Sequence, residues 1–189
     1  MISAYGKILL IGSNLWYLGE GMFGPLFAVF VGGIGGDILD ISWAWALYLG
    51  VQGILMIQFG KLADKMNPEK LMVFGYGLNA LFTFSYLLVS APVHLFLVQI
   101  GLGVAGAIAT PTWNALYDKH SDDKFNGYIW GSADGQALIV TAIAMVIGGY
   151  IVSLVSFKAL FITMGTIQVI ATIYQAKIFW GRKTKEPQV

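Results

Sequence analysis

The chain has 189 residues, of which 57% are apolar and only 11% are charged, with a formal net charge of +1 and no cysteine. A soluble domain carries roughly a quarter charged residues, so this chain has too few charges to cover a surface in water, and we expect its solvent to be lipid. The near-neutral charge argues against a nucleic acid as a partner. The absence of cysteine excludes disulfides, thiol nucleophiles and cysteine-based metal sites.

Six apolar segments approach the roughly 20 residues that a helix needs to cross the hydrocarbon core. The first is too long for the core of a secretory signal and no small-x-small cleavage site follows it, so we interpret it as a retained helix. The sequence predicts an all-α membrane protein in which residues 1–189 form a single six-helix bundle, with a basic cytoplasmic tail at residues 181–189. The predicted spans are residues 7–31, 42–62, 70–90, 93–116, 127–152 and 158–180.

The distribution of basic residues predicts the orientation of these spans. With the N-terminus in the cytoplasm, every lysine and arginine except Lys158 falls on the cytoplasmic side. We therefore expect a multi-pass protein of the plasma (inner) membrane with both termini in the cytoplasm.

In chain order, the first candidate for chemistry is Glu20, near the middle of the first span. At helical spacing it shares a face with Trp16 and Phe23. A carboxylate near the bilayer midplane is costly and usually faces a water-filled cavity or a partner, and no Lys or Arg lies in the central part of any span. Such a carboxylate tends to hold a proton, so Glu20 is a candidate site for proton or cation coupling. The alternative is a protonated Glu20 that only hydrogen-bonds a neighbouring helix.

Three amides extend the predicted pathway. Gln52 and Asn79 fall near the midplane of the second and third spans, and Gln99 lies nearer the outer end of the fourth. With Glu20, Trp16 and Phe23, they form the predicted substrate or ion pathway. Polar side chains in membrane helices also join helices, and this is the alternative for each amide.

The loop between the second and third spans, residues 60–70 (GKLADKMNPEK), resembles the signature G-x-x-x-D-[RK]-x-G-[RK]-[RK] of the major facilitator superfamily of membrane transporters. Gly60, Asp64 and Lys65 match in register, and Asn67, which can also adopt a left-handed turn, replaces the second glycine. The resemblance implies that the three matching residues belong to a conformational gate. In it, Asp64 would face the start of the fifth helix in the other half of the transporter. The alternative for Asp64 is a solvated loop residue.

The start of the fourth span adds to this resemblance. Residues 99–107 (QIGLGVAGA) resemble the family's R-x-x-x-G-x-a-g-a stretch, with Gln99 where many proton-coupled members carry arginine. This departure argues against proton coupling, because the arginine is thought to tune a carboxylate on the first helix.

Asp134, about two turns into the fifth span, has two interpretations. It either faces the cytoplasmic vestibule or pairs with Lys119 or Lys124 of the preceding loop, and the ion pair is favoured. Four tryptophans near predicted span ends indicate an interfacial belt, namely Trp43, Trp45, Trp130 and Trp180.

His120 lies in a loop with three aspartates, Asp118, Asp122 and Asp123, but the loop is charged and we predict no metal site there. No Ser-His-Asp arrangement, phosphate-binding glycine loop or paired catalytic carboxylate stands out. The sequence therefore predicts neither an enzyme nor a cofactor.

Members of the resembling family have twelve helices in two six-helix halves, and each half is a 3+3 inverted repeat. The resemblance covers the N-terminal half, which implies either a half-transporter that works as a parallel homodimer or the N-terminal half of a longer protein. The predicted function is secondary active transport of a small solute by alternating access. Its partners would be the lipid bilayer, a second copy of the chain and the solute, coupled to H⁺ or another cation. The alternative function is a non-transporting membrane scaffold or accessory subunit.

Overall fold

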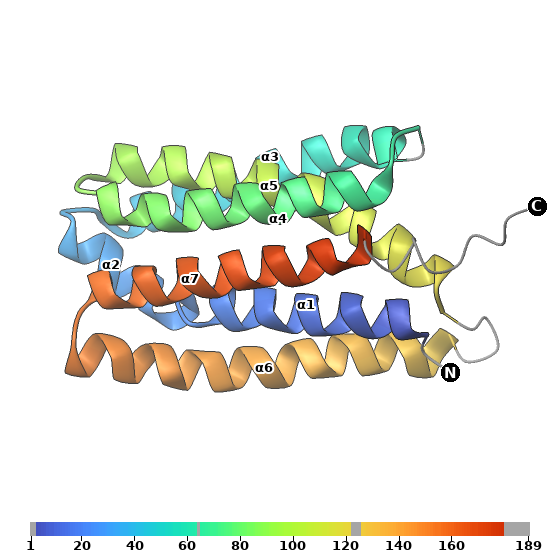
Figure 1. The fold of residues 1–189 in the computed structure, drawn as a ribbon. Helices are drawn as coiled ribbons and strands as arrows, with labels where there is room; N and C mark the ends of the chain where they lie inside the picture. The colour runs from blue at the N-terminus through green and yellow to red at the C-terminus, as the bar shows by residue number, and fades with distance from the viewer. Residues whose placement is uncertain (1–2, 64, 122–125, 180–189) are drawn as a thin grey trace, which may run out of the picture.

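The computed structural model describes residues 3–63, 65–121 and 126–179, and these residues are almost entirely helical (Figure 1). Short 3-10 turns lead into one of the helices and continue two others. The elements in chain order are α1 (Ala4–Gly21), η1 (Gly24–Leu26), α2 (Phe27–Gly33), α3 (Ile38–Ala63), α4 (Pro68–Ser85), η2 (Tyr86–Leu88), α5 (Pro92–Lys119), α6 (Asn126–Leu154), α7 (Phe157–Ala176) and η4 (Lys177–Phe179).

Six helical segments are long and apolar enough to cross a membrane, as judged by length and composition. The expected all-α architecture with six transmembrane helices is therefore present. The segments are Ala4–Gly33, Ile38–Lys61, Pro68–Leu88, Pro92–Lys119, Gly127–Leu154 and Phe157–Phe179.

Local sequence explains where several helices begin. The side chains of Ser3, Asn67 and Ser156 accept hydrogen bonds from backbone N–H groups in the first turns of α1, α4 and α7. Pro68 and Pro92 occupy the first turns of α4 and α5, where a missing N–H costs no helical hydrogen bond.

The first span is not one continuous helix. α1 ends at Gly21, and η1 begins at Gly24 with Pro25, which has no N–H to donate, before α2 resumes. Helix α6 packs directly onto this interruption: a side chain on Gly148 would collide with the backbone of Met22. The break therefore begins at Met22, two residues beyond Glu20, and is held in place by a neighbouring helix.

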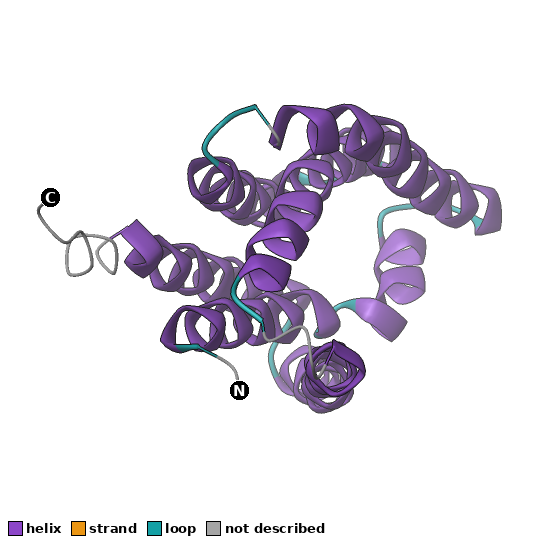
Figure 2. Ribbon diagram, turned by 90° about the vertical axis from the view of Figure 1, so that its right-hand side faces the viewer, coloured by secondary structure: helices purple, strands orange, loops and turns teal. Residues whose placement is uncertain are grey.

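The helices pack as two interleaved triplets. α1 packs against α6 and α7, α5 packs against α3 and α4, and α4 packs against α7 to join the two groups (Figures 1 and 2). In sequence, the first three spans are α1 with α2, α3 and α4, and the last three are α5, α6 and α7. The first span of each set of three packs against the second and third spans of the other set. Because α1 and α5 run in opposite directions in Figure 1, this arrangement is the 3+3 inverted repeat.

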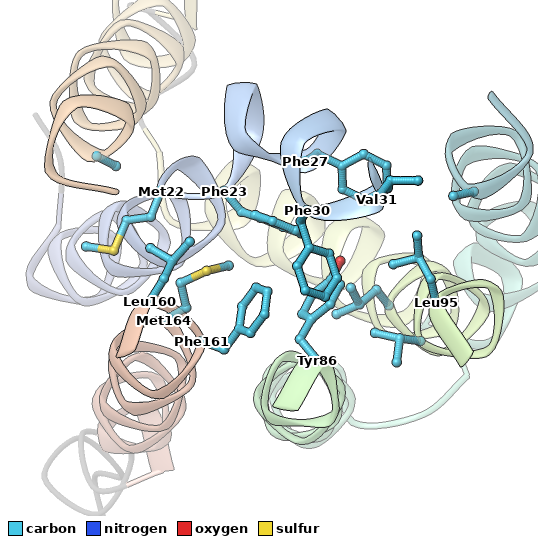
Figure 3. Close-up of a cluster of buried hydrophobic side chains, with 14 residues drawn as sticks. Met22, Phe23, Phe27, Phe30, Val31, Tyr86, Leu95, Leu160, Phe161 and Met164 are labelled. Atoms are coloured by element: carbon cyan, nitrogen blue, oxygen red, sulfur yellow. The ribbon is translucent and has the colours of Figure 1, made fainter. Parts of the chain in front are cut away.

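Two apolar clusters fill the bundle. One gathers around the broken part of the first span and is rich in aromatic rings, including Phe23, Phe30, Tyr86 and Phe161 (Figure 3). The other lies toward the end where α1 begins and α7 ends, around Leu9, Met72, Tyr117 and Ile129. By contrast, α3 and α6 expose many large apolar side chains, as expected of surfaces that face lipid or another helical unit.

Candidate functional site

Two buried amides hold the Glu20 carboxyl group. Its Oε1 atom accepts a hydrogen bond from Asn79 Nδ2 on α4 at 2.8 Å and another from Gln168 Nε2 on α7 at 3.3 Å. Asn79 is 2% exposed and Gln168 is fully buried. No lysine or arginine pairs with Glu20 in the described part of the chain. The carboxyl group is therefore fixed in position by neutral donors, without a counter-charge.

Beside Glu20 lies a cavity of about 330 Å³, which we call the Glu20 cavity. It lies between α1, the broken part of the first span, α3, η2, α5, α6 and α7, and aromatic side chains dominate its wall. Its lining residues are Trp16, Tyr17, Glu20, Gly21, Phe23, Gly24, Phe27, Trp45, Tyr48, Tyr86, Gln99, Leu102, Thr141, Met145 and Met164.

The interruption of the first span places one wall of this cavity. Phe23 makes edge-on ring contacts with Phe27 at 5.4 Å, Tyr86 at 5.0 Å and Phe161 at 5.2 Å between ring centroids (Figure 3). The Tyr86 hydroxyl group donates to Gln99 Oε1 at 3.3 Å. These contacts fix the ring positions, so this wall is formed before a ligand arrives.

Of the predicted pathway residues, the structure brings Glu20, Trp16, Phe23 and Gln99 to one cavity. Asn79 does not line the cavity, but its side chain donates a hydrogen bond to Glu20, which does. The remaining predicted amide, Gln52 on α3, does not line this cavity either. A Cβ on Gly106 of α5 would lie 2.8 Å from the Gln52 amide nitrogen, so Gln52 packs between α3 and α5.

Of the gate residues, Gly60 lies in the last turn of α3 and Lys65 follows the end of that helix. Gly60 has open space where a side chain would be, and Lys65 is exposed. Asp64 lies outside the described residues, so its predicted role in the gate stays a prediction.

Asp134 lines a second, smaller cavity of about 100 Å³, which we call the Asp134 cavity. No ion pair joins Asp134 to Lys119 in the structure, and Lys124 lies outside the described residues. Trp130 lines this cavity and its ring contacts Trp113 edge-on, with 6.3 Å between ring centroids. Its place in an interfacial belt stays a prediction.

Sequence reasoning missed two glutamines of α7. Gln175 Nε2 donates to the Leu9 carbonyl at 3.3 Å and to the Tyr76 hydroxyl at 3.2 Å, as Gln168 does to Trp16 O and Glu20. The two glutamines lie seven residues apart, and the glycines opposite them on α1, Gly12 and Gly19, are also seven apart. This matched spacing, two turns on each helix, was the available signal.

His120 packs its ring edge-on against Tyr5, with 4.2 Å between ring centroids. Burial and then the neighbouring Lys119 charge lower the pKa of His120, while Glu69 acts in the opposite direction. Among the residues that the structure describes, no group of three metal-ligating side chains is found. Asp122 and Asp123 lie outside that set. The predicted basic tail, 181–189, also lies outside it.

Comparison with known proteins gives a consistent match. The family model described as Major Facilitator Superfamily matches residues 9–189. The chain is 21% identical to multidrug resistance protein MdtG of Klebsiella pneumoniae (strain 342), over 88% of this chain and 41% of the relative. It is also 21% identical to MdtG of Escherichia fergusonii, over 96% of this chain and 45% of the relative. The chain therefore spans less than half the length of these relatives.

Proposed function

Because the chain belongs to the Major Facilitator Superfamily, whose members are membrane transporters and not enzymes, we propose that it forms one half of a secondary active transporter. This half would move a small solute across the plasma (inner) membrane by alternating access, in which one central site opens to each side in turn. The observation that carries the proposal is a carboxyl group in a preformed aromatic cavity at the centre of a membrane-spanning bundle.

The lining of the Glu20 cavity supports a cationic or amphipathic organic solute. Glu20 supplies negative charge, and Trp16, Trp45 and Tyr48 supply ring faces that attract cations. No basic residue lines the cavity to hold an anion. The relatives carry the name multidrug resistance protein, which supports a drug-like organic solute for this chain.

Glu20 is the proposed coupling residue. Its carboxyl group has amide donors and no fixed counter-ion in the described residues, so a proton or a cationic solute can neutralise it in turn. Each charge moved across about 100 mV supplies about 2.3 kcal/mol, which corresponds to roughly fifty-fold accumulation. Gln99 supplies no charge where many proton-coupled members carry arginine, which argues against H⁺ and leaves another cation as the alternative coupling ion.

A second six-helix unit is needed to close the pathway. The exposed apolar faces of α3 and α6 support pairing with such a unit, with α3 of one against α6 of the other. We propose a parallel second copy of the chain, with all termini in the cytoplasm; the second half of a longer polypeptide would complete the site in the same way.

The test is gradient-driven transport of a fluorescent aromatic cation, ethidium, in inverted vesicles from cells that produce the protein. Glu20→Gln is expected to bring accumulation down to the level of vesicles without the protein, because the neutral amide can neither bind the cation nor exchange a proton. Asp37→Asn, which removes an exposed loop carboxylate, is the control and should leave transport unchanged. A fully active Glu20→Gln protein would instead remove the coupling role from Glu20, and a wild-type protein that accumulates no more ethidium than vesicles without it would favour the scaffold or accessory-subunit function.

A further inference from the structure

The Asp134 cavity lies closer than the Glu20 cavity to the end of the bundle where α1 begins. Six side chains dominate it: Trp16, Tyr17, Tyr76, Trp113, Trp130 and Asp134. Trp16 and Tyr17 also line the Glu20 cavity, so they stand between the two. The bundle thus holds two aromatic cavities, each with one carboxyl group, on the two sides of a shared aromatic partition.

Packing fixes the rings of the Asp134 cavity. Trp113 stacks on Tyr117 with 4.7 Å between ring centroids, and its Nε1 donates to the Leu9 carbonyl at 3.2 Å. Trp130 contacts Tyr117 edge-on at 5.3 Å, and Trp16 contacts Tyr76 edge-on at 4.5 Å. A ligand that enters therefore meets ring faces already in position and loses little free energy in ordering them.

The charge of the cavity selects the ligand class. Asp134 carries the one carboxyl group among the lining residues, and no lysine or arginine accompanies it there. One carboxylate with several ring faces recognises an alkylated ammonium group, which is attracted to the rings without needing many hydrogen-bond acceptors. A volume of about 100 Å³ suits a trimethylammonium head group, since pockets for whole drug-sized molecules measure roughly 300–1,000 Å³.

We propose that the Asp134 cavity is a second binding site, separate from the Glu20 cavity, for the alkylated ammonium head group of an organic cation. Its place on a transport path rests on the proposed function, but the binding itself does not. Asp134 attracts the charge and the indoles surround the methyl groups. The shared partition of Trp16 and Tyr17 then separates a waiting cation from one bound at Glu20.

The test measures binding and not transport. Benzyltrimethylammonium is titrated by calorimetry into the purified full chain in nanodiscs, in a Glu20→Gln background that removes the other carboxyl group. Binding is expected to persist in Glu20→Gln and to weaken about tenfold or more when Asp134→Asn is added. Asp134→Glu is the matched variant that keeps the charge and should restore most of the affinity. Neopentylbenzene, which replaces the charged nitrogen by carbon, should bind much more weakly than the cation.

Three results would overturn the proposal. Loss of binding in Glu20→Gln alone would place the cation in the Glu20 cavity. Unchanged affinity in Asp134→Asn would show that the Asp134 carboxylate does not contribute to cation binding, provided that thermal unfolding shows both variants folded. Equal affinity for neopentylbenzene would show that the cavity binds apolar groups without selecting for positive charge. The vesicle assay stands apart, because transport can fail while cation binding at Asp134 persists, and the reverse also holds.

Discussion

At the scale of single residues, Asn79 shows how a membrane helix positions a carboxyl group. Its amide is buried between helices and donates to Glu20 at 2.8 Å, so its removal leaves the carboxyl group with one donor fewer. Asn79→Ala is expected to lower the free energy of unfolding by about 1 kcal/mol, in line with side-chain hydrogen bonds in membrane proteins. Unfolding of the purified protein in detergent measures this. Gln58→Ala, on the exposed face of α3, is the control, and an equal loss in both would contradict the assignment.

His120 gives a prediction for pH. Burial against Tyr5 and the charge of Lys119 lower its pKa below the ordinary value of 6.5, so the unfolded chain binds this proton more readily than the folded one. The contribution of His120 is therefore complete above pH 6.5 and is lost as the pH falls below that value. The midpoint temperature of thermal unfolding is expected to decrease as the pH is lowered from 7.5 to 5.5. His120→Asn should make this decrease smaller. A dependence that persists in His120→Asn would assign the effect to another group.

The residue scale also shows what sequence can foresee. Glu20 was identifiable because a carboxyl group in an apolar span must find a partner or a cavity. The two residues that donate hydrogen bonds to it, Asn79 and Gln168, could not be identified from sequence, because their position depends on the rotation of α4 and α7 relative to α1. Asp134 lines a cavity and makes no ion pair with Lys119, which its closeness in sequence could not reveal, whereas pairing with Lys124 stays a prediction.

At the scale of elements, the interrupted first span depends on its contact with α6. Gly148→Ala is expected to destabilise the protein by about 1–3 kcal/mol, because the added methyl group meets the Met22 backbone, which cannot move aside as a side chain could. Gly149→Ala is the matched control, since a Cβ there meets open space, and it should change stability by less than about 1 kcal/mol. Unfolding curves of both variants in the same detergent test this. Similar losses in the two would mean that helix flexibility and not close approach explains Gly148.

Hydropathy predicted the six spans well, because each apolar stretch must cover the hydrocarbon core. It did not predict the change from α1 to η1 and α2 within the first span, although Gly24 and Pro25 marked the region as able to bend. The geometry of such a break depends on which helix packs against it. That information resides in α6, more than a hundred residues away in the chain.

At the scale of the whole molecule, the proposed second copy can be tested directly. The chain has no cysteine, so Ile57→Cys near the end of α3 and Tyr128→Cys near the start of α6 provide a unique pair, both exposed. Oxidation in native membranes is expected to give a covalent dimer. The pair Phe74→Cys and Ile173→Cys, on exposed positions of α4 and α7, is the control and should stay monomeric. Monomer alone, with the α3–α6 pair placed at several depths, would exclude the homodimer and indicate a different second unit.

The matched glutamines and glycines of α7 and α1 have a mechanical consequence. Gln175 fills the space at Gly12 and Gln168 fills that at Gly19, so sliding either helix by one turn would drive a glutamine into a larger neighbour. The two helices are therefore locked against axial displacement, and any rocking of the bundle carries Glu20 and Gln168 as one rigid body. The hydrogen bond from Gln168 to Glu20 is then expected to stay constant through the proposed transport cycle. Under the proposed alternating access, what changes is the side from which water and solute reach the carboxyl group.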